Sequence, residues 1–327
     1  MNVLVTGAGG FLGHKVAEML IAKGHHVYNF SRSKYSSLEK LGVHCLQGDL
    51  KNYAEVELAL RGKNIVFHIA AKVGMWGKYS EFYEANILGT ENIIKGCHAN
   101  QVAKLIFTSS PSVVFGNDDL ENVDESIAYP KKYYSDYAKT KAIAEKRVLA
   151  ANGQYGLSTC ALRPHLIFGP GDPNLIPTLV ASARKKKLKI VGNGDNLVDV
   201  IYIDNAAKAH IQAMEHLSPN SSVAGKAYFI AQEKPVNLWE FINKILKIYR
   251  QDPIVKKINF KNAFYIGRAM ESLYRGLHKY DRAPPMTAFM ALQLAKSHYF
   301  NHANAKADFN YRPSISIDQG LERLQGG

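Results

Sequence analysis

A tyrosine and a lysine four residues apart, Tyr137 and Lys141, could together do acid–base chemistry. The stretch from 137 to 149 has a helical pattern, so both side chains lie on one face of the predicted helix. The ordinary pKa of a tyrosine is about 10, and a nearby ammonium lowers it by stabilising the phenolate. We therefore predict that Tyr137 is a general acid/base, with Lys141 as the cation that assists it.

Hydroxyl groups follow the apolar run 105–108, which we predict to be a strand ending in Thr108-Ser109-Ser110. A hydroxyl at the carboxyl end of such a strand is well placed to hydrogen-bond a substrate oxygen beside Tyr137. We predict this role for Ser110. Ser109 and Ser112 are alternative candidates for this role. A purely structural alternative is that the serine only hydrogen-bonds a backbone group of the loop.

Glycines at positions 7, 10 and 13 lie between a predicted strand (3–5) and a predicted helix (13–23). Without side chains they allow a tight turn and let a pyrophosphate approach the backbone, while the helix N-terminus offers free N–H groups. This context predicts a dinucleotide site. A bound nicotinamide would supply the hydride, and its positive oxidised ring would further lower the pKa of Tyr137.

The end of the second predicted strand (27–30) decides which dinucleotide binds. An acidic residue there would bind the ribose hydroxyls of NAD, but this chain has Ser31, Arg32 and Ser33. Arg32 can pair with a 2′-phosphate and Ser33 can donate to it, which favours NADP over NAD. Asp49, followed by Leu50, either contacts adenine or caps the next helix.

The elements that must position these residues alternate along the first half of the chain. Apolar runs at 3–5, 27–30, 43–46, 65–69 and 105–108 predict strands, and the patterns at 13–23 and 83–100 predict helices. This alternation predicts an α/β fold with a doubly wound parallel sheet and its ligand at the carboxyl ends of the strands. The turn-rich segment 169–173 divides a dinucleotide-binding domain (1–168) from a smaller, mostly helical substrate domain (169–327). Within the second domain, the apolar run 198–203 predicts one further strand.

Composition narrows the class of protein. Apolar residues make up 46% of the chain, and we find no secretory signal or apolar run long enough to span a bilayer. The three cysteines suggest neither a disulfide framework nor a zinc site, so we expect a cytoplasmic protein and no metal. The net charge is +13, but the sequence has no nucleic-acid-binding motif, so we expect no nucleic-acid partner. The basic cluster 184–189 is explained by a solvated helix end, with a phosphate ligand or a membrane surface as alternatives.

These residues together resemble the extended short-chain dehydrogenase/reductase family along essentially the whole chain. The matching pieces are Thr6 to Gly13, Asp49-Leu50, His68 to Ala71, Asn86 with Gly89-Thr90, Thr108 to Ser110, Tyr137 with Lys141, and Leu162 to Pro164. The resemblance implies a Rossmann domain, a catalytic set of Ser110, Tyr137 and Lys141, and a segment at about 197–232 that returns to the first domain. The predicted cofactor-binding residues are Gly7, Gly10, Phe11, Leu12, Gly13, Ser31, Arg32, Ser33, Asp49, Leu50, Ala70, Ala71, Lys72, Asn86, Thr108, Tyr137, Lys141, Pro164 and His165.

Within that family the chain most resembles the 3β-hydroxysteroid dehydrogenase branch, which includes sterol-4α-carboxylate dehydrogenases and bacterial 2-alkyl-3-oxoalkanoate reductases. The stretches 71–77, 108–116, 201–205 and 284–300 carry this resemblance. It implies a large apolar substrate, such as a β-keto acid or a sterol-like molecule. The residues predicted to contact this substrate are Met75, Trp76, Ser110 and Tyr202.

Three alternatives remain open at this stage. They are an NAD-dependent nucleotide-sugar epimerase or dehydratase, a non-catalytic NADP-binding redox sensor, and an enzyme that oxidises a steroid with NAD. The apolar and basic stretch 264–280 is explained by a surface helix packed on the core, by a cover over the pocket mouth, or by a membrane-surface helix. The sequence thus allows peripheral membrane contact, and it also allows a homodimer.

Overall fold

A parallel sheet of seven strands forms the centre of the computed structural model, which describes residues 1–326. Its strands run in the order β12-β7-β5-β4-β1-β2-β3. They are β1 (Asn2–Thr6), β2 (His26–Ser31), β3 (His44–Gln47), β4 (Ile65–His68), β5 (Lys104–Thr108), β7 (Ser158–Pro164) and β12 (Lys226–Ile230). The order reverses direction between β1 and β4, which opens a ligand crevice at the carboxyl ends of these two strands.

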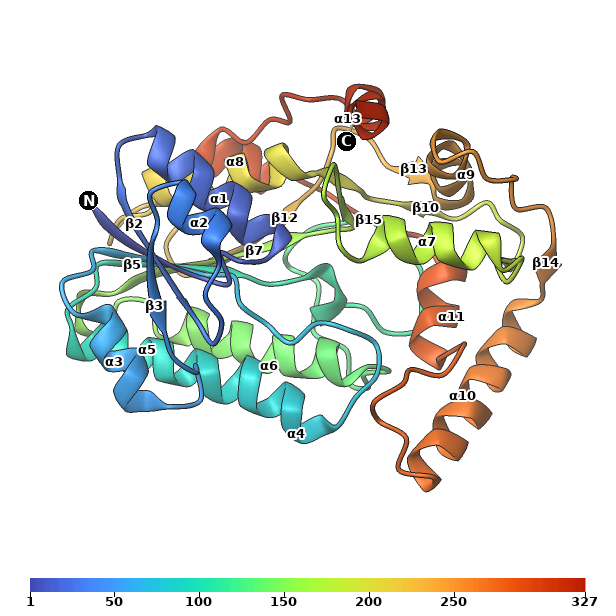
Figure 1. Cartoon of the computed structure of the whole chain (residues 1–327), viewed down its shortest axis with the longest axis horizontal. Helices are drawn as coiled ribbons and strands as arrows, with labels where there is room; N and C mark the ends of the chain where they lie inside the picture. The colour runs from blue at the N-terminus through green and yellow to red at the C-terminus, as the bar shows by residue number, and fades with distance from the viewer. Residues whose placement is uncertain (327) are drawn as a thin grey trace.

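Helices cover both faces of this sheet (Figure 1). One layer contains α1 (Phe11–Ala22), α2 (Ser36–Lys40) and α8 (Ile203–His216), and the other contains α3 (Tyr53–Leu60), α5 (Gly89–Ala99) and α6 (Asp136–Ala150). Alternate side chains of β1 enter the two layers, with Val3 and Val5 in one core cluster and Leu4 in the other. The predicted doubly wound α/β fold is confirmed.

The C-terminal part is mostly helical, also as predicted. Its helices are α7 (Leu175–Arg184), α9 (Leu238–Ile248), α10 (Phe260–Gly276), α11 (Ala288–Ala295), α12 (Ala303–Phe309) and α13 (Ile317–Arg323). A small sheet in the order β13-β10-β15-β6 joins β13 (Val236–Asn237), β10 (Leu197–Val198), β15 (His298–Phe300) and β6 (Leu120–Val123). Two further pairs join β8 (Ile167–Phe168) to β11 (Ile201–Tyr202) and β9 (Ile190–Val191) to β14 (Lys257–Ile258).

Both α8 and β12 come from the segment predicted to return to the first domain, and both belong to the layers of the central sheet. The boundary at residues 168 and 169 stays a prediction.

Two of the secondary-structure predictions were inexact. The strand expected at 198–203 is split between β10 and β11, which lie in different sheets. The helix expected at 83–100 begins with a π-helical turn, Tyr83–Leu88, which follows the short helix α4 (Tyr79–Phe82).

Within residues 1–326, no helix is both long and apolar enough to cross a membrane. The same residues hold no cluster of three or more histidine, cysteine, aspartate or glutamate side chains suited to a metal ion.

Candidate active site

The glycine turn after β1 leaves its backbone open to a ligand. Gly7 has a φ of +76°, and a β-carbon there would lie 2.8 Å from the backbone nitrogen of Ala70. A β-carbon at Gly13 would lie 2.1 Å from the carbonyl oxygen of Gly7. Gly10 donates its N–H to the same oxygen at 2.9 Å, and α1 then begins at Phe11 without a side-chain cap. The first N–H groups of α1 therefore have no partner in the helix, and the turn fits a pyrophosphate.

The end of β2 shows which side chains remain available for a 2′-phosphate. The Ser31 hydroxyl donates to the Ser33 carbonyl at 2.7 Å and accepts from the Asn29 amide at 2.8 Å. Its one hydrogen is therefore already used within the chain. The predicted contact of Ser31 with the cofactor stays a prediction. The Arg32 side chain is exposed, and among residues 1–326 its guanidinium forms no ion pair.

Asp49 follows β3 but is not the cap of the next helix. Its carboxylate accepts the N–H of Lys51 at 3.1 Å, and α3 is capped instead by Asn52, whose side chain accepts the N–H of Ala54. The capping alternative for Asp49 was therefore wrong. Its contact with adenine stays a prediction, as does the role of the neighbouring Leu50.

Asn86 supports the cofactor loop from behind. Its side chain accepts the Lys72 N–H at 2.7 Å and donates to the Lys72 carbonyl and to the Thr140 hydroxyl, at 3.1 and 3.0 Å. Both amide hydrogens are thus used within the chain, and Asn86 is buried. In this structure Asn86 holds the loop that contains Ala70, Ala71 and Lys72, and its contact with the cofactor stays a prediction.

A cavity of about 320 Å³ opens at the carboxyl edge of the sheet. Its lining comes from the start of α1, the ends of β5 and β7, the segments after β4, β5 and β7, the start of α6 and the start of α7: Phe11, Leu12, Ile69, Ala71, Val73, Thr108, Ser109, Ser110, Tyr137, Lys141, Pro164, Leu166, Ile167, Asp172, Asn174 and Leu175. The structure therefore brings all three predicted catalytic side chains to one cavity. The sequence did not indicate Leu166, Asn174 or Leu175, which follow the strand and turn where the predicted first domain ends.

The Ser110 hydroxyl is oriented by its neighbour. Its oxygen accepts the Ser112 N–H at 3.2 Å and the Ser112 hydroxyl at 2.9 Å. Ser110 therefore keeps its own hydrogen for Tyr137 or for a substrate oxygen. The Ser109 hydroxyl, in contrast, is buried in the cavity wall without a hydrogen-bond partner among residues 1–326. An unpaired buried hydroxyl fits a ligand that brings a polar group to this wall.

Lys141 is buried beside the end of β5. Its ammonium donates to the Thr108 carbonyl at 2.5 Å and lies 3.9 Å from the centre of the Phe107 ring. Burial lowers the pKa of Lys141 to about 7, while the carboxylate of Glu145 acts in the opposite direction. A group with this pKa changes its charge in the neutral range, where general acid–base catalysis operates.

Tyr137 departs from the sequence-based expectation. Burial raises its pKa above the ordinary value, and the hydrogen bond with Ser110 only partly opposes that rise. The expected net lowering of this pKa is wrong for the protein without its cofactor, because burial disfavours the charged phenolate. Tyr137 is thus held in its protonated, acid form.

A buried ion pair lies directly behind Lys141. Arg163 binds Glu145 through two hydrogen bonds of 2.9 and 2.7 Å, and Tyr129 donates to the same carboxylate at 2.6 Å. Both charged side chains are almost completely buried. Glu145 was not among the predicted site residues, although its position four residues after Lys141 places it on the same helix face.

The predicted substrate residues lie in different environments. Met75 is exposed, and Trp76 donates its indole N–H to the Lys279 carbonyl at 2.9 Å and stacks on Tyr280. Neither lines the cavity, although Val73 in the same loop does. Tyr202 was misplaced: its ring is buried against Phe168, in the main core cluster.

His165 does not line the cavity either. The Nε2 atom of His165 lies 2.6 Å from the Nδ1 atom of His298. The Nε2 atom of His298 lies 2.9 Å from the Gln293 carbonyl oxygen. Burial holds the pKa of His165 well below the ordinary value, so the ring is neutral. A packing role fits this buried pair better than the predicted contact with the cofactor.

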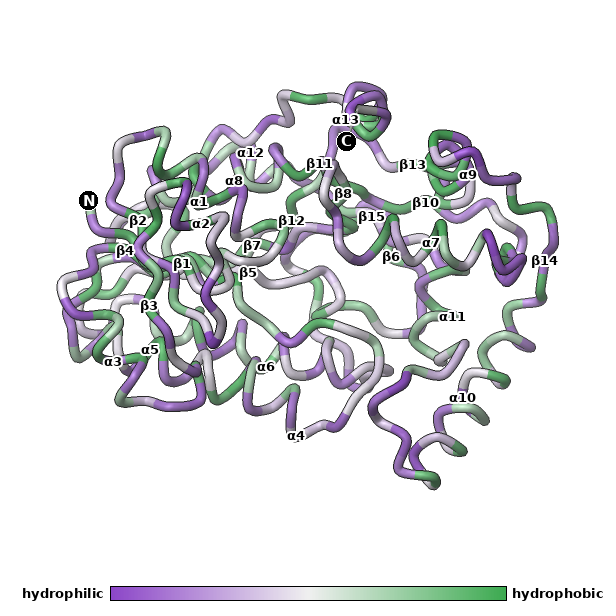
Figure 2. The backbone as a smooth tube through the Cα atoms, viewed as in Figure 1, coloured by the Kyte–Doolittle hydropathy of each residue, from purple (hydrophilic) through white to green (hydrophobic). Residues whose placement is uncertain are grey.

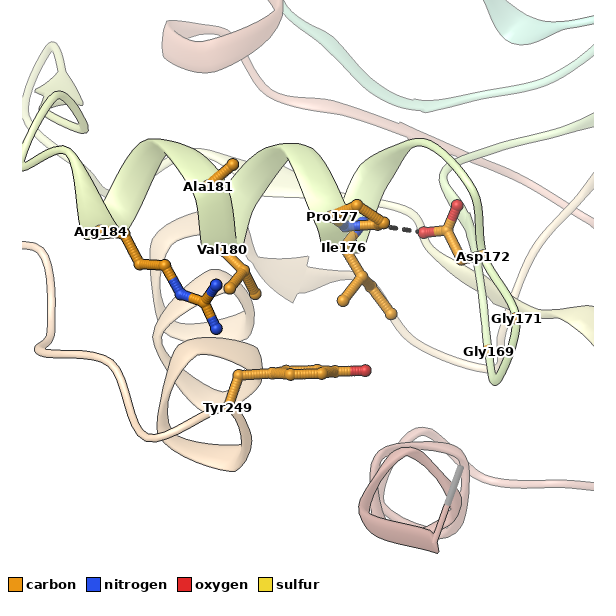
Figure 3. Close-up of a pocket in the computed structure, with 9 residues that line it drawn as sticks. All are labelled: Gly169, Gly171, Asp172, Ile176, Pro177, Val180, Ala181, Arg184 and Tyr249. Carbon is orange, nitrogen blue, oxygen red and sulfur yellow. Dashed lines mark hydrogen bonds between the residues drawn. The ribbon is translucent and has the colours of Figure 1, made fainter.

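A second cavity of about 320 Å³ lies between α7 and Tyr249, just after α9 (Figure 3). It shares Asp172 with the first cavity, but the Asp172 carboxylate is used to bind the N–H groups of Asn174 and Ile176 at the start of α7. Its other polar side chains, Arg184 and Tyr249, form no acid–base pair like that of Tyr137 and Lys141, and we assign no chemistry to it.

Comparisons with known proteins agree with this geometry. The model of the 3-beta hydroxysteroid dehydrogenase/isomerase family matches residues 4–258. A 2-alkyl-3-oxoalkanoate reductase of Shewanella oneidensis is 44% identical over 331 residues, which cover 99% of this chain and 85% of that protein. A decarboxylating sterol-4-alpha-carboxylate 3-dehydrogenase of Mus musculus is 36% identical over 322 residues, which cover 98% of this chain and 88% of that protein.

Among solved structures, MoeE5 in complex with UDP-glucose and NAD superimposes with a TM-score of 0.76 at 21% identity. The match covers 100% of this chain and 98% of that one. At this identity the likeness shows the fold alone, and it is the same doubly wound architecture.

Proposed function

Since the chain belongs to the 3-beta hydroxysteroid dehydrogenase/isomerase family, we propose that it interconverts a ketone and a secondary alcohol on a large apolar substrate, with NADP as cofactor. Membership confirms the predicted family resemblance, and the chain is an enzyme of the oxidoreductase class. The observation that supports the specific proposal best is that Ser110, Tyr137 and Lys141 line one cavity with Phe11 and Leu12, the first residues of α1 after the glycine turn.

The residues at the crevice fit a dinucleotide. Its pyrophosphate would lie on the N–H groups at the start of α1, and its 2′-phosphate would pair with Arg32 and Ser33. When bound, the nicotinamide supplies or takes up a hydride. NAD remains the alternative cofactor, and the ratio of NADPH to NADH turnover distinguishes the two.

The catalytic steps assigned to the chain concern the substrate oxygen. In ketone reduction the Ser110 hydroxyl hydrogen-bonds that oxygen, and Tyr137 donates its proton to it as the carbon accepts the hydride, which gives the alcohol. The Lys141 ammonium stabilises the phenolate that remains on Tyr137. In alcohol oxidation Tyr137 removes the proton instead, and each step runs in reverse.

The substrate class is proposed from the lining and from the relatives. Ile69, Val73, Leu166, Ile167 and Leu175 give the cavity an apolar wall beside the polar catalytic edge. This suits a ketone that carries an alkyl chain, such as a 2-alkyl-3-oxo acid, with a sterol-like ketone as the second candidate. We further propose that this is a cytoplasmic enzyme that acts on small lipid-like molecules.

The test is NADPH consumption with 2-alkyl-3-oxo acids of increasing chain length, beside a sterol-like ketone. We expect kcat/KM to rise with chain length, and indifference to chain length would contradict the substrate proposal. Tyr137→Phe is expected to lower kcat by about 10²–10⁴-fold. Tyr134→Phe is the matched control, since Tyr134 is half-buried nearby but does not line the cavity.

Two alternatives have their own signatures in the same experiments. Purified protein that retains NAD firmly and shows no net NADPH consumption would favour a nucleotide-sugar epimerase or dehydratase. A biological effect that survives Tyr137→Phe would favour a redox sensor.

A further inference from the structure

Helix α10 is joined to the body of the protein along a narrow strip. Of its 17 residues, only Ala263 and Gly267 are buried. Gly267 permits close contact with the next segment, because a β-carbon there would lie 2.6 Å from the Thr287 backbone. Figure 1 shows α10 at the edge of the molecule, where one side of the helix packs against α11. Phe260, Phe264 and Tyr274 on the same side are half-buried. The packed-helix explanation therefore accounts for this inner face but not for the outer half of the helix.

The outer half of α10 carries large apolar side chains in contact with solvent. Tyr265 is 68% exposed and Leu273 is 59% exposed, and Ile266 and Leu277 are exposed as well. Ile266, Leu273 and Leu277 are spaced by seven and four residues, so they lie along one line of the helix. Figure 2 shows hydrophobic and hydrophilic residues alternating along this segment. Contiguous exposed apolar side chains of this kind mark a surface that contacts another phase or molecule.

Cations form a second line along the same helix. Lys261, Arg268 and Arg275 are spaced by seven residues and are all exposed. The apolar line and this cationic line border the solvent-facing half of α10 on its two sides. A helix that presents apolar and basic side chains together fits the interface of an anionic bilayer, where the apolar groups enter the acyl boundary and the cations meet headgroups.

The C-terminal end of α10 is tied to the mouth of the catalytic cavity. The Trp76 indole binds the Lys279 carbonyl, lies edge-on to Tyr274 and is covered by Arg275. Three residues before Trp76 in the same loop, Val73 lines the catalytic cavity and is itself 59% exposed. The apolar surface thus continues from α10 to the rim of the cavity.

We propose that α10 and the loop 73–76 form a docking surface for an anionic lipid bilayer, which places the mouth of the catalytic cavity against the membrane. The binding of this surface to lipid does not depend on which reaction the enzyme catalyses. Only the delivery of a lipid-like substrate to the cavity rests on the proposed function.

A second copy of the chain fits this surface less well. Arg268 lies at the middle of α10, so a two-fold contact between two such helices would bring Arg268 next to its own counterpart. The net charge of +13 also opposes self-association.

The test is flotation of the full-length protein with vesicles of phosphatidylcholine alone or mixed with phosphatidylglycerol, without substrate. We expect binding to the anionic vesicles that weakens as salt rises. The double variant Leu273→Glu/Leu277→Glu should lower the partition coefficient by about 100-fold or more, at about tenfold per leucine. Arg268→Glu should lower it by about fivefold or more on anionic vesicles only.

The matched control is Leu58→Glu, since Leu58 is 61% exposed on α3, away from this surface. It should leave flotation unchanged, and circular dichroism verifies that every variant is folded. Absence of wild-type flotation, or equal loss in Leu58→Glu, would overturn the docking surface. If light scattering shows a dimer that the α10 variants dissociate, the surface binds a second copy of the chain and not a bilayer.

Activity assays separate this inference from the proposed function. With a long-chain ketone dispersed in anionic vesicles, the double variant should lose kcat/KM, while a short water-soluble ketone should be reduced as by wild type. If no ketone is reduced but flotation behaves as expected, the proposed function fails and the docking surface stands.

Discussion

The ion pair behind Lys141 offers the sharpest test of how the site is supported. Glu145 and Arg163 are 0% and 3% exposed, and Glu145 accepts two hydrogen bonds from Arg163 and one from Tyr129. Glu145→Gln keeps the size of the side chain but removes its charge. Arg163 then remains buried without a counterion, because no other carboxylate is paired with it among residues 1–326.

Breaking a buried pair by removing one partner costs about 3–5 kcal/mol of stability. For a chain of this length each kcal/mol lowers the melting temperature by about 2 °C, so Glu145→Gln should melt about 6–10 °C below wild type. Tyr129→Phe removes only one hydrogen bond to the carboxylate and should cost about 1 kcal/mol. Thermal unfolding followed by circular dichroism measures both.

The same substitution should shift the pH dependence of catalysis. The carboxylate of Glu145 raises the pKa of Lys141 against the effect of burial, which by itself lowers it. Since the ammonium form assists Tyr137, kcat/KM for ketone reduction should fall as pH rises through the pKa of Lys141, near 7 in wild type. In Glu145→Gln that fall should occur at lower pH.

The matched control is Glu91→Gln on α5, which breaks the partly exposed pair with Arg147, a residue of α6 like Glu145. An exposed pair contributes about 0–1 kcal/mol, and this one is not next to Lys141. If Glu145→Gln loses no more stability than Glu91→Gln and keeps the wild-type pH profile, the assigned role of the buried pair is refuted.

Three further substitutions test the cofactor and substrate sites. Gly13→Ala places a β-carbon 2.1 Å from the Gly7 carbonyl and should weaken dinucleotide binding by about 100-fold or more in a fluorescence titration. Gly276→Ala, which meets nothing within 4 Å, should bind normally. Arg32→Ala should reduce the preference for NADPH over NADH by about 10- to 150-fold in kcat/KM, and an unchanged ratio would remove Arg32 from the 2′-phosphate site. Ser110→Ala should lower kcat by about 100-fold with little change in cofactor affinity; a normal kcat would transfer its role to Ser109.

Much of the architecture was predictable because it depends on local patterns. The alternation of apolar runs and amphipathic segments predicted the first five strands of the sheet, and the glycine turn was recognisable from its position between a strand and a helix. The strands β7 and β12 were missed, because buried strands lack the alternation that identifies a half-exposed strand. The π-helical turn at Tyr83–Leu88 was also missed, since its hydrophobic pattern barely differs from that of an α-helix.

The catalytic proposal was predictable for a similar reason, but the state of its groups was not. A tyrosine and a lysine one helical turn apart face the same way in any fold, so the pairing of Tyr137 and Lys141 needed no tertiary information. Their pKa values depend on how completely the surrounding chain excludes water. Burial therefore reversed the expected direction for Tyr137.

By itself, then, the sequence determined the first five strands of the sheet, the glycine turn and the residues that face one another along a single helix, because these follow from periodicity and from backbone conformation. Only the tertiary structure decided that Asn86 is used up behind the cofactor loop, that Tyr202 belongs to the core and that α10 is left with an uncovered apolar line. Hydrogen bonds and burial of this kind join residues that are far apart in the chain. A side chain is available to a ligand only if no distant residue already accepts its hydrogen bond or covers its surface.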